Sequence, residues 1–246
     1  MSKGNSLELA WIAGVGASAG LGSALARRFA RGGLHVLMTG RNEARLSSVA
    51  AEITNAGGSA SALPGDLSNP AEADRLGAAV RQQGTLRAAV FNAGNMIRGN
   101  ALEVTPEQFE STWRGSAYAG FLFVRSSLPL LLEAGGGSLL LTGATASVRG
   151  GGPFIAFASA KAALRSVAQS AAREYGPQGI HVAHVIIDGG IDGEHLRSGA
   201  PDRAAAAGAD GLLHPDAIAD TYWHLHQQTR SAWTHELDLR PFKERF

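Results

Sequence analysis

A run of glycines near the start of the chain offers the clearest chemistry in the sequence. The run Gly14-Val-Gly-Ala-Ser-Ala-Gly-Leu-Gly22 directly follows an apolar stretch and opens a helical pattern. Backbone N–H groups at a helix N-terminus attract a pyrophosphate, and glycines permit its close approach. A ligand-free tight turn would use the same glycines. The context favours a dinucleotide site with contacts at Gly16, Ser18, Gly20, Leu21 and Gly22.

The next chemical signal follows the second apolar stretch, where the sequence reads Thr39-Gly40-Arg41-Asn42. An NAD-specific site needs an acidic side chain here for the ribose 2′-hydroxyl, whereas an arginine suits a 2′-phosphate. Arg41 therefore predicts NADP(H) as the cofactor. The alternative is a solvated arginine on a loop.

A third signal lies on a predicted helix that begins near Pro153 and ends at Tyr175. Phe157 and Lys161 stand four residues apart on it, so they share one face. An amine can donate hydrogen bonds to a ligand, whereas a phenyl ring cannot donate a proton. The alternatives are a solvated lysine and a phenylalanine that serves as wall or core.

Composition limits the possible functions. The chain has 246 residues with 45% apolar and 17% charged side chains, and 22 basic against 21 acidic groups give a net charge of +1. This balance implies no nucleic-acid or membrane partner, so we expect a small-molecule substrate. The sequence has no cysteine, so it offers no disulfide and no thiolate metal site, and we predict no metal. We expect a soluble, cytoplasmic protein.

Short apolar runs alternate with longer segments of helical periodicity, which indicates a parallel sheet covered by helices on both faces. The prediction is an α/β, Rossmann-like, doubly wound sheet in a single domain over residues 1–246. The expected strands are Leu9 to Val15, His35 to Thr39, Ser59 to Leu63, Ala88 to Asn92, Ser138 to Thr142 and His181 to Ile187.

Two further segments can be assigned from local signals. Thr105-Pro106-Glu107-Gln108 combines a capping hydroxyl, a proline and a glutamine in the pattern of a helix start, and predicts a helix to about Glu133. Residues 192–215 read as an irregular Gly/Ala-rich insertion that could form a lid, before a last helix and strand.

Taken in order, these motifs resemble the short-chain dehydrogenase/reductase family across nearly the whole chain. The resemblance implies an NADP-dependent enzyme whose cofactor turn is Gly16-x-x-x-Gly20-x-Gly22. Lys161 is similar in position to the family's active-site lysine. The resemblance also implies cofactor contacts at Asp66 and Leu67, at Asn92, Ala93 and Gly94, and, on the loop that begins at Asp188, at Gly189 and Ile191.

The departures from the family are equally consistent. The family's asparagine would fall at Ala117, its serine at Ala144 and its tyrosine at Phe157. The resemblance therefore implies an atypical active site in which Lys161 alone is retained and three apolar residues line the substrate pocket.

Two substrate chemistries fit such a pocket. Thr145 or Asp188 could donate the missing proton, although either could be an ordinary turn residue. Alternatively, the substrate is an iminium, which gains a hydride without forming an oxyanion, or an activated alkene. General acid catalysis typically contributes roughly 10²- to 10⁴-fold, so its loss would cripple ordinary ketone reduction. The competing function is a non-catalytic NADP(H)-binding protein or a silent subunit.

The family resemblance also implies assembly, because members commonly pair through their fourth and fifth helices. The segment from Ala156 to Ala172 carries small residues that would permit close helix contact, so we expect a homodimer or homotetramer. These residues are Ala160, Ala163, Ala168 and Ala171.

Overall fold

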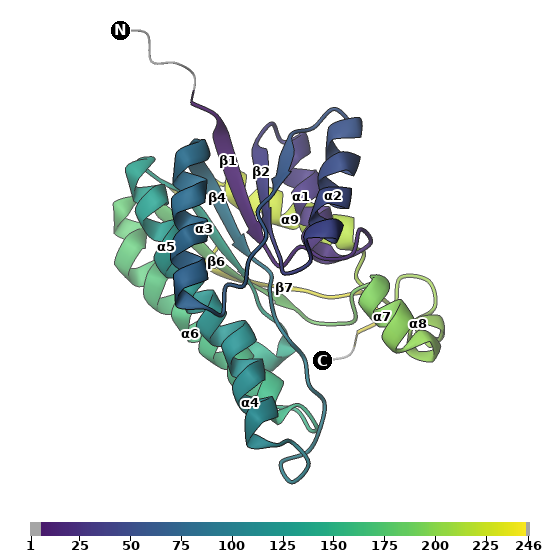
Figure 1. Cartoon of the computed structure of the whole chain (residues 1–246). Helices are drawn as coiled ribbons and strands as arrows, with labels where there is room; N and C mark the ends of the chain where they lie inside the picture. Colours follow the sequence, from purple (N-terminus) through teal and green to yellow (C-terminus); the bar gives the residue numbers. More distant parts are fainter. Residues whose placement is uncertain (1–5, 245–246) are drawn as a thin grey trace, which may run out of the picture.

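A seven-stranded parallel sheet forms the centre of the protein (Figure 1). The computed structural model describes residues 6–244. The strand order is β3-β2-β1-β4-β5-β6-β7, and every neighbouring pair is parallel, so the predicted doubly wound α/β fold is confirmed. The strands are β1 Glu8–Ala13, β2 His35–Thr39, β3 Ala60–Ala62, β4 Thr85–Phe91, β5 Gly137–Thr142, β6 Ile180–Ile187 and β7 Glu236–Leu239.

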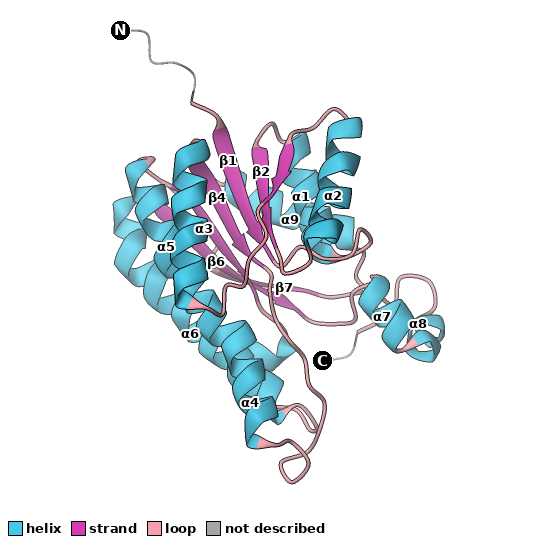
Figure 2. Cartoon of the chain, viewed as in Figure 1, coloured by secondary structure: helices cyan, strands magenta, loops and turns pink. Residues whose placement is uncertain are grey.

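Helices cover both faces of this sheet (Figure 2). One layer holds α1 Leu21–Arg31, α2 Glu43–Asn55 and α9 Pro215–Gln227, and the other holds α3 Pro70–Gln83, α4 Pro106–Trp113, α5 Ala119–Glu133 and α6 Ile155–Tyr175. Because both faces are covered, the central strands are apolar along their length, and β6 is buried at every residue.

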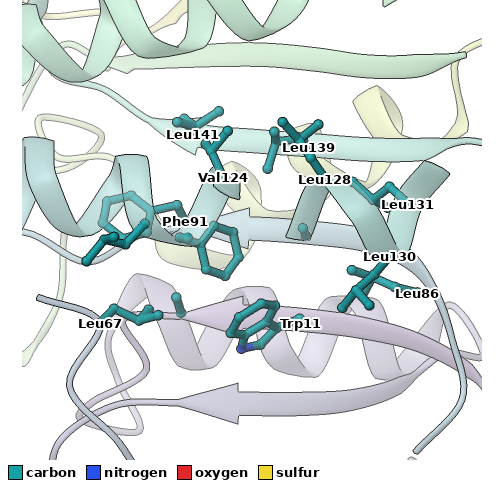
Figure 3. Packing of buried hydrophobic residues seen from close by; sticks show 14 of the residues in the cluster. Trp11, Leu67, Leu86, Phe91, Val124, Leu128, Leu130, Leu131, Leu139 and Leu141 are labelled. Atoms are coloured by element: carbon teal, nitrogen blue, oxygen red, sulfur yellow. The ribbon is translucent and has the colours of Figure 1, made fainter. Parts of the chain in front are cut away.

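Aromatic packing fixes the sheet centre against α5 (Figure 3). The Trp11 ring lies 4.6 Å from that of Phe123, which lies 5.6 Å from Phe91. The indole Nε1–H of Trp11 donates a hydrogen bond of 2.9 Å to the Thr39 hydroxyl, so its polar atom is satisfied in the core. These contacts hold the central strands β1 and β4 in place.

The helix predicted from Thr105 to Glu133 has the expected start but is not uniform. The capping box between Thr105 and Gln108 is present. Residues Arg114–Tyr118 form a π-helical segment between α4 and α5, a local widening that hydrophobic periodicity does not reveal. The stretch Pro106–Glu133 is apolar and long enough to span a membrane, but 61% of its most apolar window is buried inside the protein, as in a core helix.

The segment 192–215 is more regular than predicted. It contains two short helices, α7 Glu194–Gly199 and α8 Pro201–Ala207, which project from the main layers in Figure 1. The expectation of an irregular loop was wrong because it gave weight to glycine. Pro201 stands at a first helical position and an alanine run follows, and both favour a helix.

The side of the sheet on which successive strands are added switches between β1 and β4. From β1 it proceeds to β2 and β3 on one side, and from β4 to β7 on the other. At such a switch point the two loops leave the carboxyl ends of neighbouring strands in opposite directions, which leaves a crevice for a ligand. The glycine turn and the segment from Asn92 to Gly94 follow these two strand ends, and the other predicted site residues follow the ends of β2, β3, β5 and β6, apart from Ala117 in the π-helical segment and Phe157 and Lys161 on α6.

Candidate active site

The glycine turn joins β1 to α1 at this switch point. Gly14 has φ of +83°, and a Cβ there would lie 2.4 Å from the Ala93 backbone nitrogen. A Cβ at Gly22 would lie 2.3 Å from the Gly14 carbonyl oxygen, so the helix packs on the strand without room for a side chain. By contrast, a Cβ at Gly16 would meet no atom within 4 Å. The turn is therefore tight underneath and open at Gly16, where a phosphate could approach.

The N-terminus of α1 is electrostatically suited to an anion. Gly20 is its N-cap, and among the described residues no side chain caps the helix and no acidic residue stands in its first turn. The unpaired N–H groups and the positive end of the helix dipole therefore face the turn. Ser18 lies at the rim, where its hydroxyl donates a hydrogen bond of 2.6 Å to Glu52.

The predicted adenine and ribose contacts lie beside β2 and β3. Arg41 is exposed at the end of β2, and its guanidinium makes no hydrogen bond or ion pair within residues 6–244. Asp66 is exposed and accepts hydrogen bonds of 2.9 and 2.8 Å from the backbone and hydroxyl of Ser68. The side chain of Leu67 is buried in the core, so only its backbone could contact a ligand.

Residues Asn92 to Gly94 connect the glycine turn to the catalytic side. The Asn92 side-chain amide donates a hydrogen bond of 3.3 Å to the Gly14 carbonyl. A Cβ at Gly94 would lie 3.4 Å from Ser116 Oγ and 3.5 Å from Lys161 Nζ. The structure therefore brings the predicted Asn-Ala-Gly segment against both the cofactor turn and Lys161.

Lys161 is buried on the inner face of α6, with 5% of its surface exposed. Its Nζ donates a hydrogen bond of 2.8 Å to the Thr142 carbonyl and lies 5.8 Å from the centroid of the Phe157 ring. Burial lowers the pKa of this amine from 10.5 to about 8, because desolvation disfavours the charged form. The solvated-lysine alternative is therefore wrong for this residue.

Thr145 and Asp188 contact each other. The Thr145 hydroxyl donates to Asp188 Oδ1, and Asp188 Oδ2 lies 2.9 Å from Arg240 Nη2. Asp188 is thus not a turn carboxylate that bonds only its own backbone. Arg240 stands directly after β7, far along the chain, and no sequence signal linked it to this site.

The three apolar positions are brought together by α6, which contacts both the π-helical segment carrying Ala117 and the turn carrying Ala144. Ala117 is buried, whereas Ala144 and Phe157 are half-buried. Two hydroxyls beside them escaped the sequence analysis. Ser116 Oγ accepts a 3.3 Å hydrogen bond from the Asn95 N–H, and Ser147 Oγ accepts a 3.0 Å bond from the Ala144 N–H. Ser116 directly precedes Ala117 and Ser147 lies three residues after Ala144, so closeness in the sequence was the available signal.

A second polar group lies under α6. His184 is fully buried, and its Nδ1 lies 3.0 Å from Glu236, which Arg165 contacts with two hydrogen bonds of 2.6 and 2.7 Å. Burial lowers the pKa of His184 to about 4, so the imidazole is neutral near pH 7 and donates from Nδ1 to the carboxylate. This network joins α6 to β6 and β7 beneath Lys161.

Comparison with known proteins identifies the family. Residues 10–204 match the family model described as short chain dehydrogenase. The chain belongs to the short-chain dehydrogenase family. Members of that family are oxidoreductases. The chain is therefore an oxidoreductase of the short-chain dehydrogenase type.

Individual members are similar over most of the chain. A short-chain dehydrogenase structure from Rhodopseudomonas palustris is 38% identical, covers 96% of this chain and 99% of that one, and has a TM-score of 0.82. The 1-deoxy-11-beta-hydroxypentalenate dehydrogenase of Streptomyces exfoliatus is 31% identical over 214 residues, 85% of this chain and 76% of that protein. An oxidoreductase of Sarocladium schorii is 32% identical over 68% of this chain and 67% of its own length.

The fold is shared even more widely. An actinorhodin polyketide ketoreductase determined with NADPH has a TM-score of 0.87 and covers 98% of each chain, but it is only 22% identical. At that level the likeness shows the common fold, and the substrate and cofactor of this short-chain dehydrogenase must be argued from its own residues.

Proposed function

We propose that this protein is an NADP(H)-dependent oxidoreductase with a non-standard active site, which reduces a substrate that needs no proton from the protein. The preferred substrate class is an imine in its iminium form. An activated C=C or C=O bond is the second class.

The cofactor choice rests on Arg41 and the glycine turn. The open space above Gly16 and the uncapped N-terminus of α1 suit a pyrophosphate. The guanidinium of Arg41, exposed at the end of β2 and unengaged by the described residues, suits a 2′-phosphate through its planar fork. Lys161 would donate to the ribose with the protons that the Thr142 carbonyl leaves free.

The substrate class rests on one observation, that neither Phe157 nor Thr145 offers a free proton donor beside Lys161. Phe157 carries no proton donor, and the Thr145 hydroxyl already donates to Asp188. Arg240 pairs with the same carboxylate, so Asp188 accepts hydrogen bonds and holds negative charge beside the loop that follows β6. Such a site stabilises a cation better than it protonates an alkoxide.

Iminium reduction matches this electrostatic arrangement. Hydride adds to the iminium carbon, the π electrons of the C=N bond move to nitrogen, and a neutral amine forms without any proton transfer. The Asp188 carboxylate would attract the cationic substrate. Ala117, Ala144 and Phe157 would give its remaining surface an apolar wall.

A non-catalytic NADP(H)-binding role is supported by the same lack of donors. The two functions differ in turnover, which a paired assay measures. NADPH oxidation would be followed with cyclic iminium substrates and with ketones of matched shape, using wild type and Asp188→Asn. We expect at least 100-fold faster iminium reduction than ketone reduction, and slower iminium reduction by the variant. Ketone reduction at the iminium rate would contradict the proposal, and NADPH binding without turnover of either set would favour the non-catalytic role.

A further inference from the structure

The segment that follows β6 folds back over the glycine turn. A Cβ at Gly193 would lie 3.0 Å from the Ala19 carbonyl oxygen and 3.7 Å from the Gly20 Cα, so the start of α7 contacts the rim of the turn. The next residue, Glu194, lies 3.3 Å from the guanidinium of Arg45 on α2. The Arg45 guanidinium is therefore held beside the proposed phosphate-binding turn.

The glycine turn supplies no cation of its own. Its residues between Gly16 and Gly20 are Ala17, Ser18 and Ala19. Arg27 on α1 reaches the turn, but its guanidinium donates to the Ser18 carbonyl and lies 3.6 Å from Glu52. The remaining nearby cations stand on α2 and at the end of β2. Arg41 and Arg45 stand there four residues apart, on either side of the Asn42 N-cap.

Glu194 contacts Arg45 through one carboxylate oxygen, Oε1, and a phosphate monoester would offer the guanidinium anionic oxygens of the same kind. The Arg45 and Glu194 side chains are 53% and 49% exposed. An exposed pair of this kind contributes little to stability, so a dianionic phosphate can displace the carboxylate at small cost. Glu194 would thus compete with a phosphate for the Arg45 guanidinium.

We infer that Arg45 is a second ligand of the cofactor 2′-phosphate, for which it exchanges the Glu194 carboxylate. This inference rests on the proposed NADP(H) specificity. It adds a specificity-determining residue that lies outside the loop carrying Arg41. It also links the charge of the bound cofactor to the contact between α7 and α2.

Calorimetry with NADPH and NADH tests the inference in wild type, Arg45→Gln and Glu194→Gln. Arg45→Gln should weaken NADPH binding about fivefold to tenfold and leave NADH binding unchanged, because NADH lacks the 2′-phosphate. Glu194→Gln should strengthen NADPH binding about twofold to fivefold, and this gain should vanish when both substitutions are combined. The matched control is Arg81→Gln, which removes a remote exposed ion pair with Glu133 and should change neither affinity.

Each outcome has a separate meaning. Arg45→Gln could weaken the binding of both cofactors equally, or could leave the binding of both unchanged. If either result occurs while Arg41→Gln removes the NADPH preference, the inference is wrong and the proposed cofactor choice stands. If wild type shows no preference for NADPH, the proposed cofactor choice fails and the inference fails with it. Amide hydrogen exchange of residues 193–199 adds a readout that does not depend on affinity. NADPH, but not NADH, should increase the exchange rate there, because the phosphate releases Glu194 from Arg45. Equal exchange rates with the two cofactors would contradict the replacement of Glu194 by the phosphate.

Discussion

Lys161 Nζ lies 5.8 Å from the centroid of the Phe157 ring and donates a hydrogen bond to the main-chain carbonyl of Thr142. The amine is therefore buried against an aromatic ring and an amide oxygen. Such an environment keeps the lysine in place for a ribose. It also makes the charged form of the amine costly, because neither neighbour is an anion.

The charge of Lys161 should appear in the pH dependence of stability. Its pKa is about 8 in the folded protein and 10.5 when unperturbed, so the unfolded chain binds more protons between these values and stability rises with pH there. Below pH 8 the buried charge costs up to roughly 3 kcal/mol. We therefore expect Lys161→Met to be more stable than wild type at pH 7, with the difference disappearing toward pH 10.5. Urea unfolding across this range measures it, and a pH-independent difference would contradict the burial argument.

Two glycines of the cofactor turn should respond differently to alanine. Gly22→Ala places a methyl group 2.3 Å from the Gly14 carbonyl, which should lower stability by about 1–3 kcal/mol. Gly16→Ala meets no atom within 4 Å, so it should leave the unfolding midpoint unchanged. It should nevertheless weaken NADPH binding, because the methyl group takes the space proposed for the phosphate. Thermal unfolding and calorimetry on both variants test the pair, and equal binding by wild type and Gly16→Ala would place the cofactor elsewhere.

Arg41 should determine the preference for NADPH. A charge-assisted contact to the 2′-phosphate is worth roughly 1.5–3 kcal/mol, or about a tenfold to hundredfold difference in affinity. Arg41→Ala should bind NADPH more weakly than wild type by this factor, and its affinity for NADH should be unchanged. Calorimetry with both cofactors measures the difference. Equal binding of the two cofactors by wild type would refute the assignment.

Assembly should involve the two helices that the sequence indicated, but other side chains on them. Ala160, Ala168 and Ala171 are buried in the protein's own fold and Ala163 is half-buried, so most of the predicted small-residue face packs inward. Large apolar side chains are instead exposed on α5 and α6 at Phe121 and Ile155, with 46% and 45% of their surface accessible. We propose a homodimer or homotetramer through this surface, which Phe121→Glu should dissociate. Light scattering that gives 25.4 kDa for wild type at micromolar concentration would reject assembly.

The sequence predicted the positions of the strands along the chain well, because buried parallel strands leave continuous apolar runs. The family resemblance implied that the glycine turn, Asn92 and Lys161 belong to one site, and the structure brings them together. It missed contacts between segments distant in the chain, such as Asp188 with Arg240, because periodicity describes each element separately. The π-helical segment escaped because the residues that follow it begin as a nearly uniform apolar run, which hides the shift that a widened turn introduces into the pattern.

The proposed function requires that neither Phe157 nor Thr145 supplies a proton to a carbonyl substrate. The most direct measurement compares ketone reduction by wild type and by Phe157→Tyr combined with Ala144→Ser, at equal NADPH saturation. Lys161 is already placed to lower the pKa of a phenol through its positive charge, so the double variant should reduce ketones at least tenfold faster than wild type. Iminium reduction should not gain. Ketone reduction by wild type that matches or exceeds that of a well-folded, NADPH-binding double variant would contradict the claim, and would show that another group supplies the proton.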